Sequence, residues 1–332
     1  MKAVILTGAP GPDAGRADEA DTRVQAELVR GVLEVDGWSV AGRELAEDPA
    51  PAEAALRAMA PDLVFNLVEA VGGRGDLVHL APELLDRLGL PHTGCPARAM
   101  RLTSDKLAAK RELAAAGLPT PKTFDATTPA TDGSWIVKSV WEHASLGMDG
   151  ESVVPADAVA EALETRRRRL GGAWFAERFV EGREFNLALL EDAGTAMVLP
   201  PAEIDFSAFP PGMARIVDYA AKWDEASFEY RNTPRRFDFA GADRALLGRL
   251  RSLSLECWRL FGLRGYARVD FRVDGLGEPW ILEVNANPCL SADAGFMAAA
   301  ARAGLGHAAV IRRIVRAPLR RPAAPGERAA CS

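Results

Sequence analysis

The first ninety residues alternate between short apolar segments and segments with helical periodicity, and this alternation limits the folds open to the chain. The apolar segments "KAVILTG", "GWSVAGREL" and "PDLVFNLVE" have the length and composition of buried strands. Between and after them, residues 18–36, the segment "PAEAALRAMA" and residues 77–88 have the periodicity of helices. Strands that alternate with helices favour a parallel sheet with helices on both faces. We therefore expect an α/β chain that begins with a Rossmann-like domain.

The next part of the chain follows a boundary near residues 93–97, where "TGCPA" interrupts the pattern. The segment "TSDKLAAKRELAAAGLPTPK" predicts a helix that Thr103 or Ser104 caps and Gly117 ends. The segment "SWIVKSV" predicts a short strand with Lys138 near its end, and a polar, glycine-containing loop follows it.

The remaining segments predict more strands and two long helices. "AWFAERFVEGREFNLALL" predicts two strands joined by a tight turn at Glu181 and Gly182. "GYARVDFRVDGLGEPWILEVNANP" predicts a β-hairpin whose turn contains Asp274 and two glycines. Helices are expected over residues 243–261 and 294–316, and a disordered Pro/Ala/Arg-rich tail from residue 317.

The hairpin carries three oxygen-bearing side chains: Asp270 on its first strand, Glu283 and Asn285 on its second. Residues two apart on a strand point to one face, and paired strands lie about 5 Å apart. Carboxylate and amide oxygens grouped in this way suit Mg²⁺, which bridges carboxylates to nucleotide phosphates. Arg268 shares the face of Asp270, where a fixed cation would stabilise developing negative charge. The alternative is a solvated polar hairpin, against which the apolar residues 280–282 argue because unpaired buried carboxylates are costly.

Two lysines are candidates for phosphate binding. Lys106 lies near the start of its predicted helix and Lys138 near the end of its strand, and two lysines in one cleft would hold a triphosphate. Taken singly, a lysine at either position is more often a surface residue than a phosphate ligand. The loop containing Ser145 and Gly147 would add backbone donors. The chain has neither a GxxxxGK[ST] nor a GxGxxG pattern nor kinase signatures, so a nucleotide site must use another scaffold.

Composition excludes several classes of protein. A chain of 332 residues suits two or three packed subdomains, and a net charge of −6 provides no basic surface for nucleic acid or an anionic membrane. No segment approaches the length of a membrane span or a signal peptide. The four cysteines are widely spaced without a CxxC pair, so neither a zinc site nor a disulfide framework is indicated. We expect a cytoplasmic protein.

The order and spacing of these segments resemble the ATP-grasp carboxylate–amine ligases, and within them the D-alanine–D-alanine ligase branch. The most specific segment is "RVDFRVD…GEPWILEVNANPCLS", which is similar to the family's R-x-D…E-x-N-x-x-P metal segment. The segments "SDKLAAKRELAAAGLPTP" and "WIVKSVWEHASLGM" follow closely, and the resemblance extends from about residue 60 to 316. It implies an α/β, ATP-grasp fold: an N-terminal Rossmann-like domain is followed by two α+β subdomains that sandwich ATP. The expected domains are residues 1–97, 98–182 and 183–316, with the tail at 317–332.

The resemblance also implies roles for individual residues. Lys106, Lys138 and Lys222 would contact the ATP phosphates, and Ser145 lies in the loop that covers them. In "ERFVEGREF", the adenine hinge, Glu177 would face the exocyclic amine, Arg178 would pack on the base and Val180 would offer backbone contacts. Glu184 would bind the ribose hydroxyls. The implied magnesium ligands are Asp270, Glu283 and Asn285, with Glu283 bridging two ions, and Mn²⁺ is an alternative metal. Arg268 and the backbone after Pro288 would hold the oxyanion.

The implied reaction has two steps. ATP phosphorylates a substrate carboxylate to an acylphosphate, and an amine then displaces the phosphate. The partners are therefore a small-molecule carboxylate and a small-molecule amine, of an amino acid or short peptide. Because acylphosphates hydrolyse, water must be excluded, and residues 142–150 are the expected covering loop. The family also implies a homodimer formed through the N-terminal domain.

The segments that would bind the amino-acid substrate depart from the family pattern. Ala144 stands where the ligases have a serine in the covering loop, Trp223 stands where they have a tyrosine after the third lysine, and Cys289 replaces the glycine after Pro288. The N-terminal acid of the family has three candidates here, Asp18, Glu19 and Asp21, none in clear register. We therefore expect a product other than D-alanyl-D-alanine. A D-alanine–D-alanine ligase with substitute recognition residues and a non-catalytic ATP-binding homologue are the alternatives.

Overall fold

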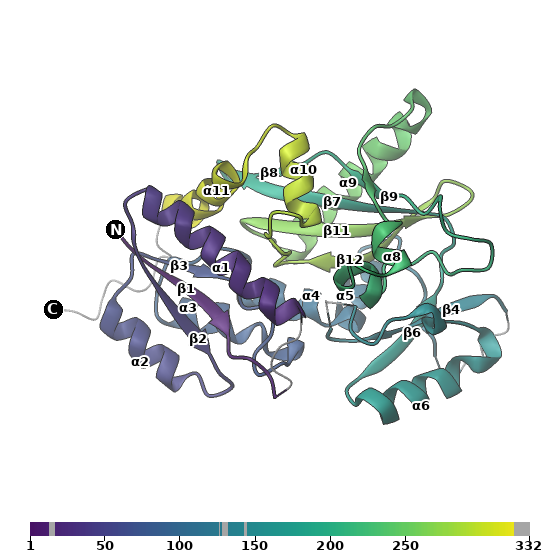
Figure 1. The fold of residues 1–332 in the computed structure, drawn as a ribbon, viewed down its shortest axis with the longest axis horizontal. Helices are drawn as coiled ribbons and strands as arrows, with labels where there is room; N and C mark the ends of the chain where they lie inside the picture. The colour runs from purple at the N-terminus through teal and green to yellow at the C-terminus, as the bar shows by residue number, and fades with distance from the viewer. Residues whose placement is uncertain (13–16, 126, 128–131, 143–144, 322–332) are drawn as a thin grey trace.

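The computed structural model describes residues 1–12, 17–125, 127, 132–142 and 145–321. Three sheets lie in one molecule, and Figure 1 has the N-terminal sheet at the left, the largest sheet across the middle and the smallest sheet at the lower right. The structure confirms the expected mixed α/β architecture with one parallel and two antiparallel sheets. No helix among the described residues is long and apolar enough to cross a membrane.

The N-terminal sheet contains the three strands expected from the alternating pattern. Its strands are parallel, in the order β2-β1-β3. β1 spans Lys2–Gly8, β2 Ser39–Leu45 and β3 Leu63–Asn66. The helices of this part are α1 (Ala17–Val35), α2 (Ala50–Met59) and α3 (Leu80–Arg87), with a 3₁₀ turn, η1, at Gly75–Leu77. β3 and the middle of β1 are buried on both faces, as in a parallel sheet between helices, whereas most residues of the edge strand β2 are exposed or half-buried.

The largest sheet has six strands in the order β10-β9-β7-β11-β12, with β8 beside β7. The strands are β7 (Arg183–Asp192), β8 (Thr195–Val198), β9 (Ala202–Ile204), β10 (Arg235–Arg236), β11 (Tyr266–Val273) and β12 (Pro279–Asn285). β11 and β12 form the predicted antiparallel hairpin, with Asp270 opposite Glu283 and Arg268 opposite Asn285. The register shifts between Asp270 and Phe271, which leaves Leu282 as the extra residue of a β-bulge.

The two faces of this sheet differ in chemistry because side chains alternate along each strand. One face carries Leu187, Val269 and Phe271, which pack with α4 (Ala97–Ser104), α5 (Lys106–Ala115) and α9 (Arg244–Phe261). The opposite face is apolar only at one end, where Ala188, Leu190 and Tyr266 lie under α10 (Gly295–Arg302) and α11 (His307–Arg320). The rest of that face is polar.

The smallest sheet is antiparallel, in the order β5-β4-β6. β4 spans Ser134–Ser139, β5 Val153–Pro155 and β6 Trp174–Arg178, and α6 (Val159–Leu170) packs on it. The two strands predicted around Glu181 and Gly182 do not pair with each other: β6 belongs to this sheet and β7 to the largest one. The remaining short elements are η2 (Gly150–Ser152), η3 (Ala156–Ala158), α7 (Tyr219–Trp223), α8 (Phe228–Arg231) and η4 (Gly241–Asp243).

Three sequence-based expectations are wrong in detail. The helix predicted to begin at Thr103 or Ser104 is α5, which begins at Lys106; Thr103 and Ser104 end the separate helix α4. Asp105 caps α5 by accepting from the backbone N–H of Ala108 at 2.9 Å. The single helix expected over 294–316 is interrupted between α10 and α11, where Gly304 has a φ of +77°. α11 continues to Arg320, so residues 317–320, expected in the tail, are helical; residues 322–332 lie outside the described residues.

Candidate active site

The polar part of the largest sheet gathers most of the residues expected to carry the chemistry. Glu184 and Asn186 project from β7, and Arg268, Asp270 and Arg272 alternate along β11 on the same face. The hairpin register adds Glu283 and Asn285 from β12. Because this face is not filled with apolar side chains, charged groups converge at its centre.

The three predicted metal-ligating side chains lie together. The Asn285 amide nitrogen donates to Asp270 Oδ2 at 3.0 Å and to Glu283 Oε1 at 3.3 Å. Asp270 also accepts both guanidinium hydrogen bonds of Arg268, at 2.7 and 2.8 Å, and one from Asn186 at 2.9 Å. The described residues contain no group of three His, Cys, Asp or Glu side chains arranged to hold a metal. Any metal here would therefore depend on two carboxylates and one amide.

Burial shapes the charge state of the Arg268–Asp270 pair. Burial raises the pKa of Asp270, and the Arg268 guanidinium opposes this shift. For Arg268, burial alone would lower the pKa, but the Asp270 carboxylate holds it above its usual value. The result is a fixed cation on the sheet face, oriented by two hydrogen bonds.

The three predicted phosphate-binding lysines surround this face. Lys106 is the first residue of α5, and its Nζ donates to the Glu142 carbonyl at 2.5 Å and lies 4.0 Å from Glu283 Oε2. Lys138 projects from β4, and Lys222 lies on α7. Burial lowers the pKa of both Lys106 and Lys222, whereas Glu283 acts in the opposite direction on each. The structure thus brings three cationic side chains from three elements to the end of β12.

The residues of the expected adenine hinge do not all face the same side: Glu177 faces Lys138, and Arg178 faces away from it. Glu177 is buried on β6 and bonds Lys138, with Oε1 and Nζ 2.7 Å apart. Arg178 points to the other side of β6, where it donates to the Asp132 carbonyl at 2.5 Å, so it is not beside Lys138. Val180 lies half-buried in the link between β6 and β7. Glu184 contacts Arg272 at 3.4 Å, and burial raises the pKa of this carboxyl group.

The expected covering loop is attached to the segment before Lys222. Ser145 is buried, has a left-handed backbone with φ +58°, and donates from Oγ to the Val217 carbonyl at 3.1 Å. The backbone N–H of Tyr219 bonds the carbonyl of Met148 at 3.2 Å. His143 and Ala144 lie outside the described residues.

A second polar cluster joins α1 to the loop that follows β12. Asp21 accepts a hydrogen bond from Cys289 Sγ at 3.0 Å and one from the Ser291 hydroxyl. Gln25 donates to Asp21 at 3.0 Å and to Glu69 at 2.9 Å, and it accepts from the backbone N–H of residue 290 at 2.8 Å. Of the N-terminal candidates, Glu19 instead bonds the backbone of Gly11, and the side chain of Asp18 lies outside the described set. Asp21 is therefore the N-terminal acid that contacts the altered loop.

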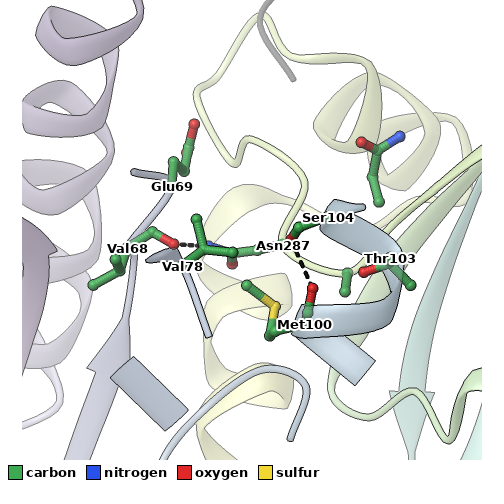
Figure 2. A pocket seen from close by; sticks show the side chains of 9 residues that line it. Val68, Glu69, Val78, Met100, Thr103, Ser104 and Asn287 are labelled. Carbon is green, nitrogen blue, oxygen red and sulfur yellow. Dashed lines mark hydrogen bonds between the residues drawn. The ribbon is translucent and has the colours of Figure 1, made fainter. Parts of the chain in front are cut away.

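Beside this cluster, a cavity of ≈ 50 Å³ separates the end of β3 from the end of β12. Figure 2 shows Asn287 bonding to the Val68 carbonyl across it, at 3.2 Å, and Ser104 bonding to the Met100 carbonyl. The carboxylate of Glu69 points away from Asn287 in this view. Asn287 also accepts a hydrogen bond from the Tyr266 hydroxyl at 2.5 Å. This cavity has room for a water molecule.

Sequence reasoning missed several polar residues of the site. Asn186 lies two residues after Glu184, so strand periodicity alone would have put both on one face. Lys110 lies four residues after Lys106, one helical turn along α5, and contacts Glu177. Gln25 and Glu69 carried no local signal, because only the packing of α1 against the loop after β12 brings them together.

Comparisons with known proteins agree with this geometry. A family model described as "D-ala D-ala ligase C-terminus" matches residues 125–316. The chain is 32% identical over 300 residues to a D-alanine–D-alanine ligase of Chromohalobacter salexigens, covering 88% of this chain and 86% of that protein. It is 29% identical to a D-alanine–D-alanine ligase of Moorella thermoacetica, covering 95% and 98% of the two chains.

The fold has a similar counterpart among solved structures. The D-alanine–D-alanine ligase of Bacillus anthracis, complexed with ATP, superposes with a TM-score of 0.71 at 19% identity, covering 96% of this chain and 98% of that one. This likeness identifies the ATP-grasp fold, and the family match and the 32% relative identify the kind of enzyme. The chain belongs to the D-alanine–D-alanine ligase family, whose members are ATP-dependent, ADP-forming ligases that join a carboxylate to an amine.

Proposed function

We propose that this chain is an ATP- and Mg²⁺-dependent ligase that forms an amide bond between an amino-acid or small-peptide carboxylate and an amine, with substrates other than two molecules of D-alanine. The observation that carries the reaction type is the convergence of Lys106, Lys138 and Lys222 on a face that also holds Arg268 and two carboxylates. Polyphosphate and metal together require such a mixture of charges.

The nucleotide would be bound between the two antiparallel sheets. The three lysines would contact its phosphates, with Ser145 in the loop that covers them. In the link from β6 to β7, the backbone of Val180 would contact the adenine base, and Glu184 would accept hydrogen bonds from the ribose hydroxyls. Glu177 and Arg178 complete the proposed adenine contacts. In this structure, the Glu177 side chain accepts a hydrogen bond from Lys138, and the Arg178 side chain donates one to the Asp132 carbonyl.

The donor set fits a magnesium ion. The Asn285 amide donates to the carboxylates of Asp270 and Glu283, so a hydrogen-bond donor with partial positive charge already occupies the space between them. A half-turn of this amide would present its oxygen beside the two carboxylates, which is the hard oxygen set that Mg²⁺ prefers. We propose two ions with Glu283 shared between them. Bound metal would neutralise charge on the transferring phosphoryl group.

The remaining steps belong to side chains of the sheet face. The substrate carboxylate attacks the terminal phosphate of ATP, which gives an acylphosphate and ADP. The amine then attacks the acyl carbon and phosphate leaves. Arg268 and the backbone N–H groups after Pro288 would stabilise the oxyanion. Residues 142–150 would exclude water from the acylphosphate.

The substrate proposal rests on the altered recognition residues. The side chains of Cys289 and Ser291 donate to Asp21, so a carboxylate of α1 lies beside the loop that would hold the acceptor. Trp223 follows Lys222 directly and adds bulk beside the phosphate lysines. A carboxylate near the loop would favour a substrate with an amino group there and disfavour a negatively charged one. The family also supports a homodimer formed through the N-terminal domain, which light scattering would test.

The deciding experiment measures ADP and phosphate release from Mg-ATP with paired L- and D-amino acids, dipeptides and amines. Glu283→Ala is the inactive control, and mass spectrometry identifies the products. We expect a particular pair to drive ADP release that Glu283→Ala abolishes, with D-alanine alone giving little. Strong release with D-alanine alone would instead identify a D-alanine–D-alanine ligase with substitute recognition residues. ATP binding without turnover of any pair would favour a non-catalytic role.

A further inference from the structure

Lys110 is a buried cation to which the reaction assigns no role. It lies on α5, one turn after Lys106, and only 5% of its side chain is exposed. Burial lowers the pKa of its ammonium group, and Glu177 opposes this shift. A lysine buried to this extent is costly unless its hydrogen bonds and its charge are satisfied.

Three groups satisfy Lys110. Its Nζ donates to Thr120 Oγ1 at 2.9 Å and to the Pro121 carbonyl at 3.4 Å, and it forms an ion pair with Glu177 Oε2. Apart from this ion pair, Oε2 has no hydrogen-bond partner among the described residues. Lys110 is therefore the counter-ion of one carboxylate oxygen.

The same contacts lead to the metal strand. Thr120 Oγ1 donates to the Ile281 carbonyl at 2.9 Å, and the Ile281 N–H bonds the Pro119 carbonyl at 2.8 Å. Ile281 lies beside the β-bulge of β12, two residues before Glu283. Lys110 thus connects β6 of the smallest sheet to the strand that carries Glu283.

Glu177 is shared between two lysines. Its Oε1 accepts from Lys138, its Oε2 pairs with Lys110, and its side chain is 1% exposed. Burial alone would raise the pKa of Glu177, but the two ammonium groups outweigh it and hold the pKa below its usual value. One carboxylate between two ammonium groups leaves a net positive charge, and Lys138 is the member that belongs to the phosphate-binding set.

We propose that Lys110 is a positioning residue: it holds one oxygen of Glu177, so that Lys138 is only partly neutralised and keeps its charge for the nucleotide phosphates. This inference rests on the proposed nucleotide site. Without Lys110, both oxygens of Glu177 would be available to Lys138 alone. The buried pair would then be neutral, and phosphate would have to compete with Glu177 for the ammonium group.

The test compares Lys110→Met, Glu177→Gln and the double variant Lys110→Met/Glu177→Gln in the full chain. Calorimetric titration with Mg-ATP gives Kd without knowledge of the amino-acid substrate, and thermal unfolding is recorded for each protein. We expect Lys110→Met to weaken Mg-ATP binding by roughly tenfold or more, since Glu177 then neutralises Lys138 and competes with the phosphates for its ammonium group. The double variant removes the competing carboxylate, so its Kd should match that of Glu177→Gln alone, which carries the same change at the proposed adenine contact.

A merely structural role makes a different prediction. If Lys110 only fills space, Lys110→Met should weaken binding by the same factor in the wild-type and Glu177→Gln backgrounds, and equal factors would overturn the proposal. Wild-type affinity in Lys110→Met would overturn it as well. If Lys110→Met does not fold, Lys110→Arg, which keeps the charge, must bind more tightly than Lys110→Gln. Failure of the wild-type chain to bind Mg-ATP would refute the nucleotide site itself.

Discussion

At the scale of single residues, the loop after β12 is where this chain differs from the pattern of its family. Cys289 donates its thiol to Asp21, and burial raises the pKa of Cys289 far above its usual value, so the group is a neutral donor. Ser291 bonds the same carboxylate. The conformation of the loop is thereby tied to α1 through side chains that a glycine could not supply. Trp223 is half-buried on α7 beside Lys222.

These two positions can be tested by reversion toward the family pattern. In Trp223→Tyr/Cys289→Gly, we expect ADP release driven by D-alanine alone to rise at least about tenfold, because a site built around a hydroxyl and a small loop residue is restored. Coupled-enzyme assays of ADP at saturating Mg-ATP would measure this. Trp223→Phe/Cys289→Gly is the matched control, since it reduces bulk without adding the hydroxyl. No rise in the double variant would mean that other positions exclude D-alanine.

At the scale of elements, the sequence predicted those features that depend on residues close together in the chain. The strands of the N-terminal sheet, the β11–β12 hairpin and the proximity of Asp270 to Glu283 follow from alternation and turn residues. The contact of Glu177 with Lys110 did not follow, because Lys110 comes from a helix and the contact depends on how α5 meets β6. No local sequence pattern marked Leu282 as the extra residue of a bulge, beside which the Ile281 N–H bonds the Pro119 carbonyl.

The cap of α5 is an element-scale feature with a measurable consequence. Asp105→Ala removes the acceptor for the Ala108 N–H and should destabilise the protein by about 1 kcal/mol. Lys106 is the first residue of this helix, so fraying should also weaken Mg-ATP binding. Thermal unfolding and calorimetric titration would record both effects. Ser104→Ala is the control: its hydroxyl bonds the Met100 carbonyl within α4, and its loss should cost roughly half as much or less.

At the scale of the whole molecule, two of the apolar cores join several parts of the protein, whereas the core of the smallest sheet is separate. One core joins the N-terminal sheet, α10 and α11 to the largest sheet, and a second joins α4, α5 and α9 to the other face of that sheet. The buried core of the smallest sheet contains only residues between 135 and 176. Figure 1 shows this part, with β4, β6 and α6, at one side of the molecule. The proposed nucleotide site lies between this part and the polar face of the largest sheet.

Because its core is separate, the smallest sheet should open without unfolding the rest. Leu163 on α6 and Leu253 on α9 make a matched pair, with 7% and 8% exposure in different cores. Each Leu→Ala change should remove about 2–4 kcal/mol from its own unit. Leu253→Ala is expected to lower the main thermal transition. Leu163→Ala should leave that transition nearly unchanged and speed hydrogen exchange only in β4, β6 and α6.

Nucleotide links this local stability to the proposed function. Mg-ATP that bridges the two sheets would bind only the closed, folded form of the smaller part, so it should restore protection in Leu163→Ala in proportion to its concentration above Kd. Hydrogen exchange measured with and without Mg-ATP would resolve this peptide by peptide. If Leu163→Ala instead lowered the main transition as much as Leu253→Ala, the two units would share one cooperative core. In that case the smallest sheet could not close on the nucleotide independently of the rest of the protein.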